Sequence, residues 1–380
     1  MKYVAPEEIL LGYNQSGKPD TMQYIPILES LKLLLEHEDV LSELLSHKQS
    51  QDGIIRDYCD GYVYRRNPLF IRYPTALQIK YYYDDFTLNN QFRDRGRKYK
   101  ISGHYFVLGN LDAKYRSKLD MMQLVMLCRS SHVKKYGAEQ ILQPLIRDIH
   151  ILETEGITVQ LDGNEYHFYG TISFVASDNL GAHFMAGMFE NFSTVLRQCR
   201  FCNSTKHNMH NNYDEGTFQS RANKEIWNTQ AEAGTDNMDF ARVYGIKRHS
   251  PLNQLSYYHV SQGLPSDASH DLFEGVIPII LQTLFGRFVD QGHFTYAELS
   301  IGVARFKYVE VDKKNAIPIL GSTAGTMKIK FTQAQTWCFL RLLPLMIGSL
   351  IPFGNGDWDF LLSDIFDLSH NYCSYFVLNF

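Results

Sequence analysis

Three strand-like segments, separated by helical patterns, do most to limit how this chain can fold. Residues 77–85 alternate between apolar and polar side chains, which is the pattern of a strand with one buried face. A second strand is expected at 100–108, and residues 171–176 form an apolar run typical of a strand buried in the middle of a sheet. Helices are expected near 118–130 and 138–154. The order strand, strand, helices, strand predicts an α/β fold with a mixed sheet.

The remaining patterns divide the chain into four regions. Apolar residues at three- and four-residue spacing predict helices within 24–48, and Asp162-Gly163 predicts a hairpin turn between two short strands. Helical patterns return at 271–290 and near 332–348. The expected organisation is an N-terminal helical segment at 1–70, a core at 71–198, a mostly irregular or helical Cys/His insertion at 199–270 and a helical part at 271–380.

Composition excludes several classes of protein. With 44% apolar and 21% charged residues, the chain is neither disordered nor collagen-like nor a coiled coil, and six cysteines are too few for a disulfide scaffold. Its start lacks a signal-peptide pattern, and the longest uncharged apolar tract, Leu342–Asn355, is too short to span a bilayer. These features predict a soluble intracellular protein that is neither secreted nor bound to a membrane.

Acidic residues stand at the ends of two expected strands. Asp84 and Asp85 end the first strand, and Asp178 follows the apolar run at 171–176. Carboxylates from separate strands can hold two Mg²⁺ ions roughly 4 Å apart for phosphoryl transfer on a nucleic acid. Acidic residues are also common at strand ends, and Asp178 could simply cap a helix that starts near Leu180.

A Cys-x-x-Cys pair indicates a second possible metal site. Cys199 and Cys202 could share one zinc ion, with His207 and His210 close enough in the sequence to join, although the spacing fits a standard zinc finger poorly. Ordinary unpaired cysteines are the alternative. Further along, His270 follows Asp267 by three residues, an arrangement that a capped helix start would equally explain.

A basic stretch lies between the first two expected strands and continues past the second. Residues 92–118 carry eight Lys or Arg against two Asp, with tyrosines interleaved, although the net charge of the whole chain is −4. Such a stretch can contact phosphates and stack on bases, or it can be a solvated turn. The candidate DNA contacts are Arg93, Arg95, Arg97, Lys98 and Lys100.

Taken in order, these motifs resemble the catalytic region of a CACTA-like DDE/D transposase. The resemblance covers about residues 20–320 and rests on YYYDDF, on GTISFVASDNLGAHFMAGMFENFS, on CRFC and on SDASHDLFEGV. It implies a partial RNase H-like fold in which Asp84 and Asp178 are catalytic and hold Mg²⁺ or Mn²⁺. It also implies a structural zinc ion held by Cys199, Cys202 and His270.

The chain departs from the family at the third catalytic acid. The family has a Glu on a later helix, and no matching Glu occurs before Phe380. The expectation is a transposase-derived chain, truncated at its C-terminus, whose parental activity is metal-dependent DNA strand cleavage and transfer and which is itself catalytically incomplete. The alternatives are a domesticated DNA-binding or protein-interaction module and an unstable gene-fragment product. The expected partner is DNA in the nucleus, with possible self-association and no small-molecule substrate.

Overall fold

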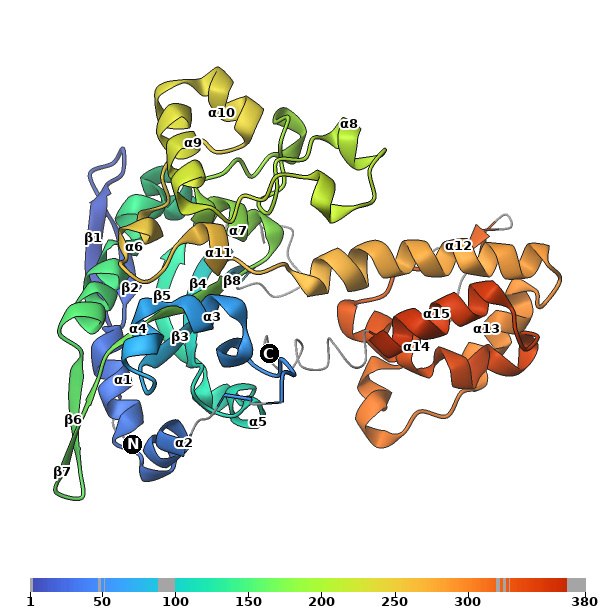
Figure 1. Ribbon diagram of the computed structural model, residues 1–380, viewed down its shortest axis with the longest axis horizontal. Coiled ribbons are helices and arrows are strands. Elements are labelled where there is room, and N and C mark those ends of the chain that lie inside the picture. Colours follow the sequence, from blue (N-terminus) through green and yellow to red (C-terminus); the bar gives the residue numbers. More distant parts are fainter. Residues whose placement is uncertain are drawn as a thin grey trace. The chain divides into compact units, whose positions relative to one another are not determined.

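The chain divides into two units, each with its own hydrophobic core, in the computed structural model of the protein (Figure 1). The first unit extends to Pro265 and the second begins at Ser266. The structure describes residues 3–46, 49–50, 52–87, 100–318, 322–323, 326–327 and 329–367.

A six-stranded mixed sheet organises the first unit, which confirms the α/β class. The strand order is β1-β2-β5-β4-β3-β8; β8 runs parallel to β3, and the other neighbours are antiparallel. The strands are β1 (Glu7–Tyr13), β2 (Pro19–Tyr24), β3 (Leu77–Thr87), β4 (Lys100–Leu108), β5 (Gln123–Arg129) and β8 (Gly170–Ala176). A separate hairpin pairs β6 (Ile157–Leu161) with β7 (Asn164–Phe168) through the expected turn at Asp162 and Gly163.

The parallel pair β3 and β8 fixes where the acidic residues leave the sheet. Tyr82 of β3 is paired with Ala176 of β8, so residues two positions further along each strand lie at the same level. Those residues are Asp84 and Asp178. The topology therefore brings together two carboxylates that are far apart in the sequence.

Helices cover the two faces of this sheet. On one face, the long helix α6 (Ser130–Thr154) lies against β4, β5 and β8 and contacts α1 (Ile27–Leu35), which α2 (Glu38–Ser46) follows. Gly137, with a φ of 74°, kinks α6 near its start. On the other face, Lys80 of β3 reaches Asp57, next to the short turn η1 (Tyr58–Asp60) that precedes α3 (Tyr62–Arg66) and α4 (Pro68–Arg72).

Two of the sequence expectations are wrong. Residues 7–24 form β1 and β2 instead of belonging to a helical segment; β1 is mostly exposed and bulges near Gly12, so its apolar alternation is weak. The helix expected near 118–130 is largely the strand β5. Val125 and Met126 are consecutive buried residues, because β5 lies inside the sheet and is covered on both faces, and such apolar runs do not distinguish strand from helix.

The strand expected in the middle of the sheet lies at its end. β8 is the last strand in the described order, yet Thr171, Ile172 and Ser173 are all buried. Helix α11 (Val260–Gly263) contacts β8, and α6 covers one of its faces. The continuous apolar character of β8 thus reflects coverage by helices.

The region at 199–265 is more helical than its polar composition suggests. It contains α8 (Lys206–Met209), α9 (Lys224–Asp236), α10 (Met238–Tyr244) and α11, and it follows α7 (Asn179–Ala186). Trp227 of α9 is almost fully buried in the core of the first unit. An isolated bridge between Met188 and Ile246 joins the segment after α7 to the segment after α10.

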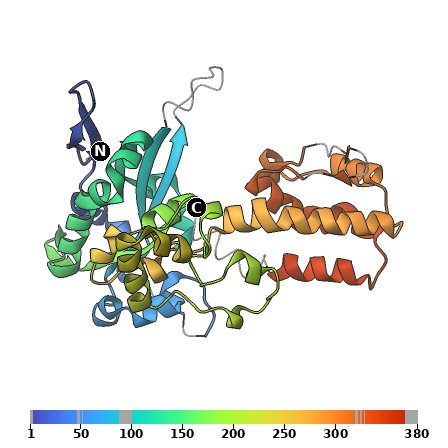
Figure 2. The ribbon, with the colours of Figure 1, turned by 90° about the horizontal axis from the view of Figure 1, so that it is seen from above.

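The second unit is helical. A π-helical segment η7 (Ser269–Val276) continues into α12 (Ile277–Asp290), and Figure 2 shows them as one rod beside α15 (Gly356–Asp367). The remaining helices of the unit are α13 (Tyr296–Arg305) and α14 (Gln333–Ile347), and β9 (Ser322–Thr323) pairs with β10 (Thr326–Met327). The helical patterns expected at 271–290 and 332–348 are confirmed.

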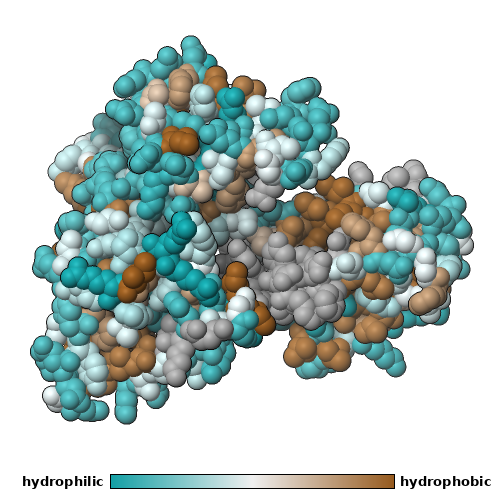
Figure 3. Space-filling model, viewed as in Figure 1, coloured by the Kyte–Doolittle hydropathy of each residue, from teal (hydrophilic) through white to brown (hydrophobic). Residues whose placement is uncertain are grey.

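The rod of η7 and α12 has one packed side and one exposed side. By length and composition alone, Ser269–Asp290 is the one run among the described residues that could cross a membrane. Phe273, Leu281 and Phe285 are buried in the core of this unit, as in a core helix, whereas Ile279 is 65% exposed. Figure 3 shows hydrophobic side chains gathered over this segment.

Candidate metal and nucleic-acid site

An open cleft of about 420 Å³ lies where β3 and β8 end. The first turn of α7 and the start of α6 form its walls, together with the segment after α10. Both predicted catalytic residues line it. Its charged lining residues are Asp84, Asp85, Lys100, Lys134, Asp178, Glu190, Lys247 and Arg248.

Asp84 and Asp178 each use one carboxylate oxygen in a local hydrogen bond. Oδ1 of Asp84 accepts from the backbone N–H of Asp85 at 2.7 Å. Oδ1 of Asp178 accepts from the backbone N–H of Gly181 at 2.6 Å and thereby caps α7. The capping role that the sequence also suggested for Asp178 therefore exists, and it leaves the second oxygen of the carboxylate for another partner.

The surroundings of Asp84 in the cleft disfavour the negative charge of its carboxylate. Burial raises the pKa of Asp84 above its usual value, and the nearby carboxylates of Asp178 and Asp85 raise it further. A cation bound to two ionised carboxylates stabilises them by offsetting their mutual repulsion. Mg²⁺ binds through one or two carboxylates together with water and substrate phosphates. The described residues, those of the cleft included, contain no group of three or more His, Cys, Asp or Glu side chains placed to hold a metal ion.

Four basic side chains share the cleft with the carboxylates. Lys100 Nζ lies 3.4 Å from Asp85, and Lys247 Nζ lies 2.9 Å from Glu190. Lys134 and Arg248 also line the cleft. The mixture of carboxylates and cations suits a ligand that combines metal ions with phosphate groups.

Glu190 is a cleft residue that sequence reasoning missed. It follows α7 in an irregular segment and belongs to the stretch GTISFVASDNLGAHFMAGMFENFS, but no periodicity or spacing within that stretch marks it as a site residue. The bridge between Met188 and Ile246 lays this segment beside Lys247, which pairs with Glu190. Only the tertiary pairing reveals the residue.

The basic stretch is only partly a candidate DNA surface. Arg93, Arg95, Arg97 and Lys98 lie outside the described residues, and Lys100 lines the cleft as expected. Arg116, which contributes to the charge of the stretch, is 3% exposed and pairs with Asp57 on the covered face of the sheet. Its positive charge is therefore used inside the fold.

Cys199 and Cys202 lie close together beside a buried guanidinium. Burial raises the pKa of the Cys199 thiol, and Cys202 interacts with it. Arg221 is 1% exposed and donates to the backbone oxygens of Cys202 at 3.1 Å and Tyr244 at 2.7 Å. Burial lowers the pKa of Arg221 to about 10, while the two cysteines act in the opposite direction. Burial therefore favours the neutral thiol of Cys199 while no metal ion is bound.

The described residues do not complete a tetrahedral zinc set around these cysteines. No cluster of three or more His, Cys, Asp or Glu side chains suited to a metal ion occurs among them. His207 and His210 are exposed near α8, and His270 belongs to the second unit, where it bonds to Asp267 and lies 3.9 Å from Glu274. Of the set that the resemblance implies, Cys199 and Cys202 lie together in the first unit.

Comparison with known protein families finds no family that matches the chain, and no curated protein matches it either.

Proposed function

We propose that this protein derives from a DDE/D transposase of the CACTA-like type and that the cleft is the remnant of its catalytic site. The order of β5, β4, β3 and β8 supports an RNase H-like core. In such a core the first three strands of the sequence, here β3, β4 and β5, are antiparallel neighbours, and the first of them, β3, pairs in parallel with the fourth, β8. In this proposal β1 and β2 extend the far edge of that sheet.

The proposal rests mainly on one observation. Asp84 and Asp178 have the same register at the ends of two adjacent parallel strands, and both line the cleft. Bound Mg²⁺ or Mn²⁺ would activate the attacking oxygen and stabilise the leaving oxygen of a phosphodiester. Asp84 and Asp178 would hold the metal, while Lys134 and Arg248 would neutralise phosphate oxygens along the strand.

Strand cleavage is expected to be weak or absent in this chain. The other two carboxylates in the cleft, Asp85 and Glu190, are already paired with Lys100 and Lys247. A second metal ion would therefore lack a strong ligand, and the charge of the transition state would be poorly stabilised.

DNA binding without cleavage is the second candidate function, and the four basic residues of the cleft favour it. Such binding would weaken steeply with salt, because the cations displace counterions from the phosphate backbone. Work on DNA also implies the nucleus as the site of action, and the distribution of a tagged chain tests this.

Metal titration and DNA nicking test the main proposal. Losing a residue that only orients a metal ligand typically lowers metal affinity by ~10–100-fold. Asp84→Asn and Asp178→Asn would each remove a proposed ligand itself, so each should lower Mn²⁺ affinity by more than that. Asp120→Asn is a suitable control, since Asp120 is exposed and does not line the cleft. Equal Mn²⁺ affinity in the wild type and both cleft variants would refute the metal site.

Nicking of supercoiled DNA with Mn²⁺ then separates the two functions. Weak nicking that both Asp variants abolish supports retained transposase chemistry. Salt-dependent DNA retention without nicking, unchanged in both variants, supports the binding module.

A structural zinc ion is proposed on Cys199 and Cys202. The buried charge of Arg221 would be balanced by two thiolates, which is the form that binds zinc. Metal analysis of the purified chain should find about one zinc per molecule, and the Cys199→Ser, Cys202→Ser double variant should lose it. Cys338→Ser, in the second unit, is the control. Stoichiometric zinc in the double variant would rule out this site.

A further inference from the structure

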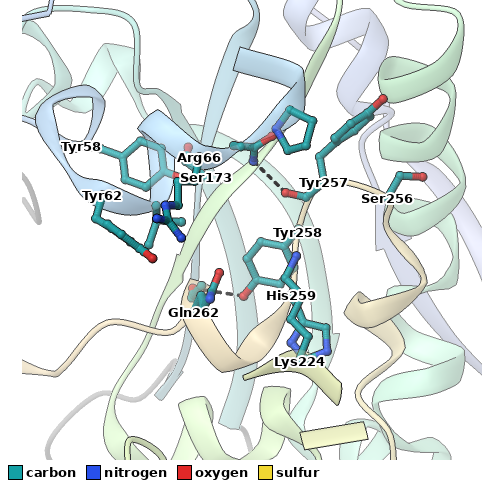
Figure 4. A pocket seen from close by; sticks show the side chains of 14 residues that line it. Tyr58, Tyr62, Arg66, Ser173, Lys224, Ser256, Tyr257, Tyr258, His259 and Gln262 are labelled. Carbon is teal, nitrogen blue, oxygen red and sulfur yellow. Dashed lines mark hydrogen bonds between the residues drawn. The ribbon is translucent and has the colours of Figure 1, made fainter. Parts of the chain in front are cut away.

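A second cavity, of about 200 Å³, lies in the first unit away from the residues of the cleft. Its walls come from η1 and α3, from β8, from the first residue of α9 and from the segment 256–263 (Figure 4). None of its lining residues is among the candidate site residues predicted from the sequence, although Ser173 lies within the stretch GTISFVASDNLGAHFMAGMFENFS.

Tyrosine rings form the walls of this cavity. Tyr58 and Tyr62 lie on one side and Tyr258 on the other in Figure 4. Tyr58 is held edge-on by Phe174 of β8 with a centroid distance of 6.0 Å, and the Tyr258 hydroxyl donates to the backbone oxygen of Gly263 at 3.1 Å. These contacts hold the Tyr58 and Tyr258 rings in place, whereas Tyr62 is 63% exposed at the edge of the cavity. Aromatic walls of this kind suit a planar ring.

Two cations stand at the cavity without acidic partners. Arg66 lies over the ring of Tyr62 at 4.5 Å, and Lys224 begins α9. Within the described ranges, neither forms a salt bridge, and none of the residues lining the cavity is acidic. Burial lowers the pKa of the lining residue His259 to about 4, so His259 is neutral near pH 7. The free positive charge of the site is that of Arg66 and Lys224.

A buried hydroxyl also lacks a partner at this cavity. Ser173 of β8 is 2% exposed, lines the cavity, and its Oγ has no hydrogen-bond partner in the described part of the chain. A buried hydroxyl left without a partner costs free energy, so one that faces a cavity indicates a ligand atom that completes it.

We propose that this cavity binds one nucleotide unit, with its base between the tyrosine rings and its phosphate at Arg66 and Lys224. Stacking on aromatic rings accepts any base, and a guanidinium or ammonium binds a phosphate. Ser173 would hydrogen-bond to the base edge. The volume lies below the ~300–1,000 Å³ of ordinary ligand pockets, which suits one ring system and not a base pair. The proposal is independent of the metal site.

Binding measurements on the full chain test this site. The probes are adenosine 5′-monophosphate, a short single-stranded DNA and the same sequence as a duplex. Tyr62→Ala and Arg66→Ala should each weaken binding about tenfold. Ser173→Ala should weaken it about threefold while leaving the thermal midpoint equal or higher, because the change removes an unsatisfied buried hydroxyl.

Control variants separate this site from the cleft. Arg65→Ala removes a neighbouring exposed cation that does not line the cavity and should leave binding unchanged. Asp84→Asn should also leave it unchanged, so the nucleotide site and the metal site can fail separately.

The probes distinguish the two sources of the nucleotide. Variant-sensitive binding of the monophosphate identifies a free nucleotide as ligand, and variant-sensitive binding of the single strand alone identifies an unpaired nucleotide within DNA. The proposal is overturned if neither the monophosphate nor the single strand binds, or if Tyr62→Ala and Arg66→Ala bind both as the wild type does.

Discussion

Asp178 combines two roles in one side chain, and substitution can separate them. Its Oδ1 caps α7 through the N–H of Gly181, while the carboxylate as a whole faces the cleft. Asp178→Ala should lower the free energy of unfolding by about 1 kcal/mol, because the cap is lost. Asp178→Asn should keep the cap and the stability but lose the metal ligand. Chemical denaturation and Mn²⁺ titration measure the two effects, and equal stability losses in both variants would contradict this division.

The charge of Asp84 should make stability depend on pH. In the folded chain the pKa of Asp84 is raised, chiefly by burial and then by Asp178 and Asp85. The ionised form therefore destabilises the fold above the folded pKa, and this cost disappears as the pH falls through the folded value towards the unfolded one.

Asp84→Asn tests this sign directly. Without added metal at pH 7, the variant should raise the thermal midpoint slightly, by no more than about 2 °C, since Asp84 is partly exposed. The gain should vanish at acidic pH and reverse when Mn²⁺ is added. A gain that is constant across pH would show that charge is not its cause.

At the level of single residues, the sequence indicated the cleft only in part. Asp84 and Asp178 were identifiable because strand ends of a mixed sheet converge, and the structure does place both in one cleft. Glu190 and Lys247 were not identifiable, since a bridge between two irregular segments positions them. Ser173 and Tyr258 carried no signal either, because an apolar strand or a loop uses such residues for packing alone.

Among the elements, the contact between α7 and β3 sets the spacing of the two carboxylates. Gly181 lies in the first turn of α7, and a Cβ atom there would lie 2.9 Å from Tyr83 Cδ1 and 3.0 Å from Asp178 Oδ1. Tyr83 immediately precedes Asp84. Glycine therefore allows the helix to approach the strand closely enough for both acids to face one cleft.

Gly181→Ala should disturb this approach. The added methyl must displace the Tyr83 ring or the Asp178 carboxylate, which should cost about 1–3 kcal/mol of stability and lower Mn²⁺ affinity about tenfold or more. Gly286→Ala, within α12 and with its closest neighbour 3.8 Å away, is the matched control. Unchanged Mn²⁺ affinity in Gly181→Ala would show that the close contact does not position the acids.

Elements with a clear local pattern were predictable, whereas β5 and β1 were not. The apolar face of α6 and the hairpin turn at Asp162 and Gly163 follow directly from local spacing. β5 was mistaken for a helix because neighbours on both sides bury consecutive residues. β1 was missed because its side chains are mostly exposed and its pairing partner, β2, gives it its structure.

For the whole molecule, two separate cores imply two separable stabilities. The core of the first unit includes Trp227 and Tyr81, and that of the second includes Phe285 and Trp358. The apolar faces of 277–284 and 342–351, which an unstable fragment would leave uncovered, contribute Leu281, Leu343 and other residues to the second core. Each unit therefore has the means to unfold cooperatively, and the sites proposed in the first unit do not draw on the second core.

Phe285→Ala tests this independence. Phe285 is fully buried and meets Phe339 and Phe294 edge-on, so its truncation should cost the second unit about 3–5 kcal/mol. Hydrogen exchange should then accelerate in α12, α13 and α14 while protection of β3, β4 and α6 stays as in the wild type. Mn²⁺ and nucleotide affinity should also be retained, since both sites lie in the first unit.

Phe360→Ala, at a site that is 52% exposed, controls for the loss of an aromatic ring. If hydrogen-exchange protection were lost to the same extent in β3 and α12, the two cores would unfold in one cooperative transition. Only such a shared transition would extend the destabilisation from the second unit to the first.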